Sequence, residues 1–390
     1  MSDKKPALNP TAGMPILYLV DGLRVGGAEK LIVTFAQQLR HHPDRLTIVS
    51  LQRNVPAMRT AVEEAGAQVI PLHSKKLVNP LRFQKLWQLV RREKFAVIHT
   101  HLTGANILGG MVGWLTGTPV VTTLHNTRLI SQDHLYHGRL ENWVLTHLID
   151  QVIAVGWQVA ETHQARLGLE DMMVLPNAVA QRPPLSAEKR RQIRATIIDD
   201  PEAVIFIAIG RLRPQKGFLD LLAAFAEVNK VCPRTRLLIA GQGPQEAELA
   251  ASITALGLEQ KARLLGLRHD IPDLLAASDI YVSAALWEGL PVSMLEAMAA
   301  GRPCVVTAVG DVPQVMDETM GIVLPPQQPD RLAHALLSLV QSPEQWPVLG
   351  QAARQKVATS FSADGWTEKQ LALYRELASK KRRPATAVQP

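Results

Sequence analysis

The chain has 390 residues, of which 47% are hydrophobic and 20% are charged, and its net charge is +7. This length allows two domains of ordinary size, and the composition is typical of a globular protein without an apolar run long enough to span a bilayer. Aromatic residues make up 5% of the chain, too few to favour nucleic-acid binding, so a nucleotide or an anionic membrane surface fits the positive charge better.

Residues 1–14 are polar and lack the apolar segment of a secretory signal, and the chain has two cysteines, Cys232 and Cys304. These features predict a cytoplasmic protein with neither a disulfide framework nor a thiolate metal site. Residues 1–14 and the basic tail 380–390 are predicted to be disordered.

From Ile16 onward, short β-branched runs alternate with longer amphipathic stretches, a pattern typical of an α/β fold with parallel sheets. The strands predicted in the first half are 16–20, 46–50, 69–72, 97–101, 120–124 and 152–155. Those predicted in the second half are 204–209, 237–240, 263–265, 280–282 and 304–306. The intervening stretch 181–202 is Pro-rich and charged, which predicts a linker between a domain of residues 15–180 and one of residues 203–362.

Ligands of such sheets bind beyond the carboxyl ends of the strands, and the stretch from Glu288 to Glu296 occupies such a position. Pro291 suits the first turn of a helix, so Glu288 should lie on the strand-to-helix turn and Glu296 about one and a half turns into the helix. Because helix N-termini bind anions and carboxylates accept hydrogen bonds from hydroxyl groups, a phosphorylated ligand with hydroxyls fits here. Two solvated glutamates are the simpler alternative.

Other strand-end loops carry residues suited to an anionic ligand. In the loop after the first strand of the second domain, Arg211 and Lys216 can together hold a diphosphate, with a solvated basic loop as the alternative. Gly26 and Gly27 precede a predicted helix and let the backbone approach a ligand, although the spacing is not that of a dinucleotide fingerprint. Gly241 lies on a further turn that faces the same way.

Three histidines, His99, His101 and His125, fall at strand ends of the first domain. We expect no zinc site, because no acidic or thiolate ligand lies at a diagnostic spacing. His125 is expected to hydrogen-bond a polar ligand, whereas His99 is consistent with a buried core residue. The stretch 75–92 is basic on one side and apolar on the other, which indicates either an ordinary surface helix or one that contacts anionic lipid.

Assembled in order, these loops resemble the retaining, nucleotide-sugar-dependent glycosyltransferases of the GT-B fold over nearly the whole chain. The most specific likeness is the Glu-x7-Glu motif formed by Glu288 and Glu296, and the next is Gly-Arg-x4-Lys-Gly at 210–217. Gly-Gly-Ala-Glu at 26–29 and the strand end at His125 also match.

The resemblance implies two Rossmann-like domains that face each other across a cleft, with a last helix, 363–379, that crosses back to the first domain. It also implies that Arg211 and Lys216 bind the donor diphosphate and that Glu296 accepts hydrogen bonds from the ribose. Glu288 would hold the donor sugar. The remaining residues implied in donor binding are Gly26, Gly27, Gly241, Leu265, Leu267, Gly289 and Leu290, with His125 reaching the sugar from the first domain.

The activity implied is transfer of a hexose or N-acetylhexosamine from a UDP-sugar to a hydroxyl acceptor, with retention and with no metal or other cofactor. The acceptor would be a glycan or a lipid-linked sugar, bound by loops such as 129–139, with the protein at the inner face of the membrane. Two alternatives stay open. One is an inactive nucleotide-sugar-binding subunit of a transferase complex, and the other is a nucleotide-sugar 2-epimerase, which ranks lower because such enzymes lack both motifs.

Overall fold

The structure is a computed structural model that describes residues 13–23, 26–74, 79–125 and 135–380. The chain divides into two compact units, one of residues up to Pro176 together with those from Ala363, the other of Asn177–Ser362. Each unit is built on one parallel sheet, so the predicted α/β fold with two parallel-sheet domains is confirmed. No helix within the described residues is both long and apolar enough to cross a bilayer.

The first unit has a seven-stranded sheet in the order β3-β2-β1-β4-β5-β6-β7. Its strands are β1 (Pro15–Val20), β2 (Arg45–Ser50), β3 (Gln68–Pro71), β4 (Val97–His101), β5 (Val120–Leu124), β6 (Gln151–Ala154) and β7 (Met172–Val174). Its helices are α1 (Gly27–Leu39), α2 (Pro56–Glu64), α3 (Pro80–Glu93), α4 (Thr103–Thr116), α5 (Leu135–His147), α6 (Trp157–Leu167) and α15 (Ala363–Ser379). The sequence analysis missed β7, because a three-residue strand with two methionines gives no β-branched run.

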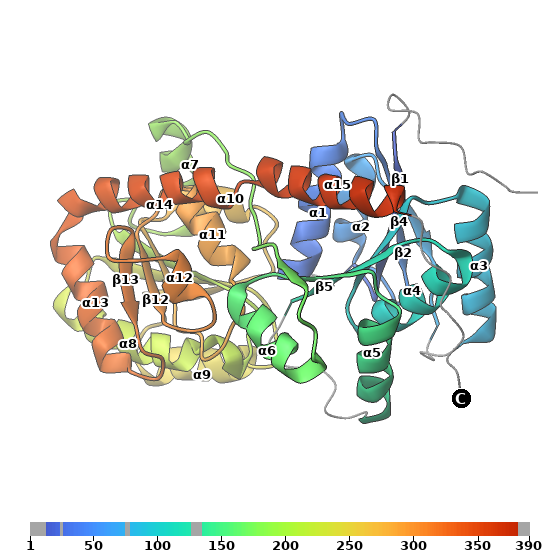
Figure 1. Cartoon of the computed structure of the whole chain (residues 1–390). Coiled ribbons are helices and arrows are strands. Elements are labelled where there is room, and N and C mark those ends of the chain that lie inside the picture. Colours follow the sequence, from blue (N-terminus) through green and yellow to red (C-terminus); the bar gives the residue numbers. More distant parts are fainter. Residues whose placement is uncertain (1–12, 24–25, 75–78, 126–134, 381–390) are drawn as a thin grey trace, which may run out of the picture. The chain divides into compact units, whose positions relative to one another are not determined.

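Different helices cover the two faces of the first sheet, and the side chains of its central strands β1, β4 and β5 are almost all buried, including the polar ones of β4 and β5. On β1, Tyr18 packs into a core with α1, α2 and α15, whereas Leu17 and Leu19 pack against α3 and α4 on the opposite face. The last helix, α15, belongs to this unit (Figure 1). The hydroxyl groups of Tyr18 and Tyr374 lie 3.0 Å apart, and Trp366 packs edge-on against Phe35.

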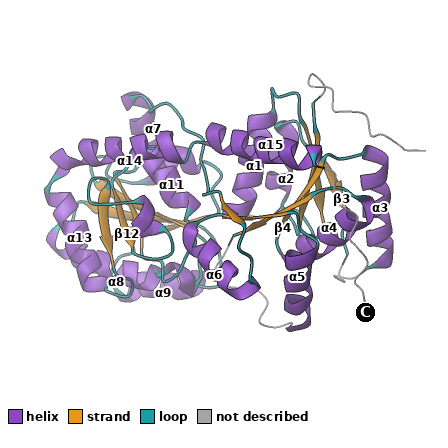
Figure 2. Ribbon diagram, viewed as in Figure 1, coloured by secondary structure: helices purple, strands orange, loops and turns teal. Residues whose placement is uncertain are grey.

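The second unit has a six-stranded sheet in the order β10-β9-β8-β11-β12-β13. Its strands are β8 (Val204–Ile209), β9 (Thr235–Ala240), β10 (Ala262–Gly266), β11 (Ile280–Ser283), β12 (Cys304–Thr307) and β13 (Gly321–Leu324). Its helices are α7 (Ala187–Ile197), η1 (Pro214–Lys216), α8 (Phe218–Val231), α9 (Glu246–Ala255), α10 (Ile271–Ala277), α11 (Val292–Ala299), α12 (Val312–Val315), α13 (Pro329–Gln341), η2 (Pro343–Gln345) and α14 (Trp346–Ser360). Helices α10, α11 and α14 cover one face and α8, α9 and α13 the other (Figure 2).

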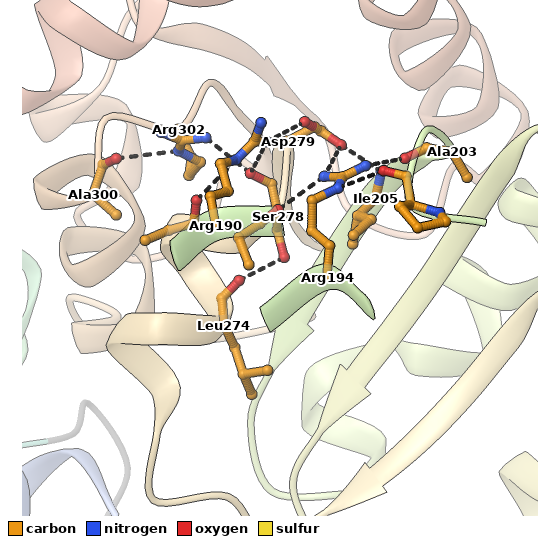
Figure 3. Close-up of polar contacts among 12 residues, drawn as sticks. Arg190, Arg194, Ala203, Ile205, Leu274, Ser278, Asp279, Ala300 and Arg302 are labelled. Atoms are coloured by element: carbon orange, nitrogen blue, oxygen red, sulfur yellow. Dashed lines mark hydrogen bonds and ion pairs between the residues drawn. The ribbon is translucent and has the colours of Figure 1, made fainter. Parts of the chain in front are cut away.

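The stretch 181–202 is not the linker that its composition predicted. It contains α7, which is bound into the second unit by ion pairs from Arg190 and Arg194 to Asp279 at 2.6 and 3.0 Å (Figure 3). Arg194 is 8% exposed and also donates to the backbone carbonyl groups of Pro201, Ala203 and Ala277. The charges that suggested a solvated linker are therefore satisfied inside the unit.

The N-terminal prediction also needs correction. Met14, assigned to a disordered segment, is buried at the start of the first sheet, and its N–H donates to Asp44 at 2.6 Å. Residues 1–12 and 381–390 lie outside the described residues, as do 75–78 and most of the predicted acceptor loop 129–139.

Candidate functional site

The basic loop of the second unit places its lysine against the first glutamate of the Glu-x7-Glu motif. The loop leaves the buried strand β8, turns through η1 and ends at Gly217, so that Lys216 forms an ion pair with Glu288, 72 residues further along the chain. The side chains are 19% and 12% exposed, which limits solvent screening of their attraction. Arg211, in the same loop, is exposed.

Two glycines allow the strand-end loops to approach each other at van der Waals distance. Gly241 follows β9 with φ of 156°, and a Cβ there would lie 1.8 Å from the carbonyl oxygen of Gly210. Gly217 has φ of 62°, and a Cβ there would lie 1.9 Å from the carbonyl oxygen of Ala284, just after β11. These positions require glycine both sterically and conformationally, and they hold the loops after β8, β9 and β11 together.

Helix α11 begins where the sequence predicted, with Pro291, whose side chain makes no capping hydrogen bond, in the N-cap position. The preceding turn is held on both sides. The carbonyl oxygen of Leu290 accepts from the Asn177 amide at 2.7 Å, and that of Gly289 accepts from the Asp311 N–H at 3.0 Å. The helix N-terminus is therefore fixed in position beside Glu288.

The other residues implied in donor binding in the second unit lie on the same sheet edge or on α11. Glu296 lies one turn into α11 and is partly exposed. Leu265 and Leu267, at the end of β10, are also partly exposed, and the Gly241 N–H donates to the Gly266 carbonyl between them at 2.9 Å. A cation, a helix N-terminus and carboxylates beside apolar side chains can bind a phosphorylated ligand that also carries hydroxyl groups.

The remaining predicted residues, Gly26, Gly27 and His125, belong to the first unit. Gly26 precedes α1 in an extended conformation that any residue can adopt, at φ of −173°. A Cβ there would lie 2.5 Å from a carboxylate oxygen of Glu29, so the glycine leaves space at this helix N-terminus.

The three histidines form a row at the end of the first sheet. The rings of His99 and His101 stack with centroids 4.4 Å apart, and Nδ1 of His101 lies 3.0 Å from Nε2 of His125. The prediction that His99 is a core residue is confirmed, since it is 1% exposed and its nitrogens contact the hydroxyl groups of Thr123 and Tyr374. Burial lowers the pKa of His99 to about 3 and that of His125 to about 4, so both rings are neutral at physiological pH.

Two carboxyl groups of the first unit, the half-buried one of Asp21 and the buried one of Glu141, were not singled out by the sequence analysis. Asp21 directly follows β1 and accepts the N–H of Ala105 at 2.8 Å, at the start of α4, and burial raises its pKa to about 6. Glu141, on α5, accepts from Thr103 at 2.9 Å and from Asn106 at 2.8 Å. A polar residue after a buried strand was a usable signal for Asp21, whereas a single glutamate in a helix gave none.

In the described parts of the chain, no cluster of three or more His, Cys, Asp or Glu side chains is arranged to hold a metal ion. In the histidine row, the ring nitrogens of His99 contact hydroxyl groups and Nδ1 of His101 faces Nε2 of His125, while Nε2 of His101 is buried without a hydrogen-bond partner among the described residues.

Comparison with known families assigns both halves of the chain. A family model described as glycosyl transferases group 1 matches residues 189–356, and one described as glycosyltransferase family 4 matches residues 25–181. The chain is 28% identical over 288 residues to an Escherichia coli UDP-Gal:alpha-D-GlcNAc-diphosphoundecaprenol alpha-1,3-galactosyltransferase, covering 71% of this chain and 74% of that protein. It is 25% identical to the N-acetyl-alpha-D-glucosaminyl L-malate synthase of Bacillus anthracis, covering 72% and 74%.

Solved structures of known proteins share the fold of this chain. HepE of Anabaena, crystallised with UDP-glucose, superposes with a TM-score of 0.82 at 22% identity, covering 93% of this chain and all of that one. Sucrose-phosphate synthase of Thermosynechococcus elongatus superposes with a TM-score of 0.74 at 20% identity, covering 93% and 99%. At these identities the likeness shows the GT-B fold.

Proposed function

The chain belongs to the group 1 and family 4 glycosyltransferases, and we propose that it transfers a hexose or N-acetylhexosamine from a UDP-sugar to a hydroxyl acceptor, with retention of configuration. The observation that carries this proposal is the ion pair of Lys216 and Glu288 beside the N-terminus of α11. A cation and free helix N–H groups suit the diphosphate of the donor, and a carboxylate suits the hydroxyl groups of its sugar.

In this proposal Lys216 and Arg211 bind the donor diphosphate. Glu288 and the N–H groups of Gly289 and Leu290 bind the donor sugar, and Glu296 binds the ribose. The base lies near the apolar end of β10 and the turn at Gly241. The candidates from the first unit are His125, as a sugar ligand, and the Gly26 and Gly27 turn before α1. These roles agree with the exposure of Arg211 and Glu296 and with the fixed turn before α11.

The proposed chemistry is a displacement at the anomeric carbon. The bond from that carbon to the diphosphate oxygen breaks and its electron pair stays on the departing diphosphate. The acceptor oxygen forms the new bond from the same face, and its proton passes to the departing phosphate oxygen. Negative charge grows on the leaving group, and Lys216, Arg211 and the helix N-terminus stabilise it without a metal ion. No protein nucleophile is assigned.

The relatives support UDP as the nucleotide and a lipid-linked acceptor. The Escherichia coli relative takes its sugar from UDP and acts on a diphosphoundecaprenol-linked sugar, and HepE was crystallised with UDP and with UDP-glucose. We propose that this chain likewise extends a glycan or lipid-linked sugar in cell-surface polysaccharide or glycolipid synthesis. Its place would then be the cytoplasmic face of the membrane, with the basic helix α3 in peripheral contact with lipid.

Replacement of the proposed diphosphate ligand tests this function. In Lys216→Ala the growing charge loses its nearest cation, so we expect turnover to fall by about 100–1,000-fold, the loss typical of removing one transition-state contact. Turnover is measured as the UDP released during donor hydrolysis or transfer. Lys230→Ala is the matched control, since that lysine is 69% exposed on α8 and, among the described residues, pairs only with Glu227. A Lys216→Ala enzyme within a few-fold of the parent would refute the assignment.

Further measurements separate the finer parts of the proposal. Glu296→Ala should weaken UDP binding by calorimetry, and an unchanged affinity contradicts the ribose role. A panel of nucleotide sugars, screened for thermal stabilisation and slow hydrolysis, identifies the donor, and the anomeric coupling constant of the product reports retention or inversion. Donor binding with neither hydrolysis nor transfer would indicate a binding subunit instead of an enzyme.

A further inference from the structure

Helix α4 presents a stripe of large apolar side chains to solvent. Met111, Trp114 and Leu115 are 38%, 49% and 52% exposed, and their spacing of three and four residues puts them on one side of the helix. The opposite side, with Ala105, Gly109 and Gly113, is buried, and Leu108 and Val112 pack into the core. The helix contains no charged residue, so nothing in its own sequence interrupts this stripe.

Helix α5, which packs on α4, exposes a further large apolar side chain. The two helices are in close contact, because Glu141 on α5 bonds Thr103 and Asn106 on α4, and a Cβ on Gly110 of α4 would lie 2.4 Å from a Val144 methyl group of α5. Outward from this contact, Trp143 is 50% exposed. Its ring stacks on that of His147 with centroids 5.4 Å apart, which orders an indole at the surface.

Helix α3 lies on the other side of α4, as Figure 1 shows, and it carries positive charge. Its exposed cationic residues are Lys85, Arg91 and Arg92, followed by Lys94 at its C-cap. The guanidinium of Arg91 lies 5.0 Å from the ring centre of Trp87, and an open hollow of about 470 Å³ is lined by Trp87, Gln88, Arg91 and Arg92. Among the described side chains of the three helices, Glu93 is the one exposed acid, and it pairs with Arg92.

We infer that this surface, the outward side of α3, α4 and α5, docks on an anionic lipid bilayer. Trp114, Leu115, Met111 and Trp143 enter the boundary between headgroups and acyl chains, where indole rings are favoured, and the cations of α3 contact acidic headgroups. The lipid contact proposed above for α3 thus extends to α4 and α5, and the apolar side chains of α4 lie at its centre. It rests on the proposed function only in that a lipid-linked acceptor would be met in the same membrane.

The charge pattern favours lipid over a second copy of the chain. A two-fold dimer through this surface would use the same patch on both copies, and the one exposed acid among its described side chains, Glu93, already pairs with Arg92, so the patch offers the cations of α3 little opposite charge. An anionic bilayer offers the opposite charge, and each cation near its surface strengthens binding by about fivefold, equivalent to about 1 kcal/mol.

Vesicle flotation of the full chain tests the inference. With vesicles of equal parts phosphatidylcholine and phosphatidylglycerol, we expect binding at low salt, and little binding to phosphatidylcholine alone. Trp114→Gln with Leu115→Gln should weaken binding at least tenfold but leave the remaining binding sensitive to salt. Arg91→Gln with Arg92→Gln should remove most of the salt sensitivity. The matched control is Val231→Gln with Val348→Gln, which removes two apolar side chains, 60% and 69% exposed, from the second unit.

The result that overturns the inference is a parent protein that does not bind anionic vesicles at low salt, or a Trp114/Leu115 variant that binds as the parent does. A parent dimer in solution that the same variant dissociates would assign the surface to a second copy instead. Hydrolysis of UDP-sugars in solution, measured on the same variants, keeps the two proposals apart. The hydrolysis rate should be unchanged in the Trp114/Leu115 variant. A parent protein that does not hydrolyse UDP-sugars would contradict the proposed function but would not affect the membrane-docking result.

Discussion

Replacement of Asp279 should destabilise the second unit more than any loss of a surface ion pair. Its carboxylate bonds Arg194 at 3.0 Å, Arg190 at 2.6 Å and the Ile205 N–H at 2.8 Å (Figure 3). In Asp279→Ala the guanidinium of Arg194, 8% exposed, stays charged without its partner, and the Ile205 N–H loses its acceptor. Breaking one side of a buried ion pair costs about 3–5 kcal/mol.

Two features of the site set the expected value within that range. Arg194 keeps three backbone carbonyl partners, which offset part of the cost, whereas the unpaired Ile205 N–H adds about 1–3 kcal/mol. We therefore expect a loss of about 4 kcal/mol. For a domain of this size, that lowers the unfolding midpoint by about 8–16 °C. Asp279→Asn keeps an acceptor of the same shape, so its loss should be smaller.

Thermal unfolding combined with hydrogen exchange by mass spectrometry measures the effect unit by unit. Peptides of β8 and β11 should lose protection in Asp279→Ala, while peptides of β1 and β4 keep it. Glu227→Ala is the matched control, because it removes a surface ion pair whose partners are 55% and 69% exposed, worth at most about 1 kcal/mol. If Asp279→Ala unfolds at the same temperature as this control, α7 is not held by the buried pair and the reasoning fails.

Two further perturbations test the site loops and the histidine row. Gly241→Ala should destabilise the second unit by about 1–3 kcal/mol and weaken UDP binding, because φ of 156° and the Gly210 carbonyl leave no place for a Cβ. Urea unfolding and calorimetry measure the two effects, with Gly257→Ala as the control, since Gly257 has a positive φ but open space around it. Equal effects of the two substitutions would contradict the steric argument. The first unit should lose stability as the pH falls below about 6.5, because its folded-state histidine pKa values are depressed and the unfolded chain binds the protons first. The raised pKa values of Asp21 and Glu141 oppose this, since each carboxyl adds stability as the pH falls, through about 6 for Asp21, but these are two carboxyls against three imidazoles. His99→Gln should flatten the fall in urea midpoint between pH 7 and about 4, and an unchanged slope would exclude the histidine row as its origin.

Local patterns in the sequence were enough to place most of the strands and the start of α11. A buried parallel strand is an apolar run between turns, and Pro291 marks a helix start whatever packs around it. The same reasoning was wrong for residues 181–202, because the sequence of a charged stretch does not show whether its side chains are solvated or paired with a buried carboxylate. Asp279 lies 85 residues from Arg194 along the chain, so composition near α7 contained no sign of it.

The sequence by itself determined which residue types stand at the strand ends, including Lys216, Glu288 and Glu296. Only the tertiary structure decided which of them meet. Strand β11 lies beside β8 although two other strands separate them in the chain, and this order brings Lys216 to Glu288. Gly217 and Gly241 then allow the contact, since a side chain at either would collide with the neighbouring loop. The physical reason is that strand and helix signals are local, whereas loop contacts depend on strand order, which buried residues far apart in the chain establish together.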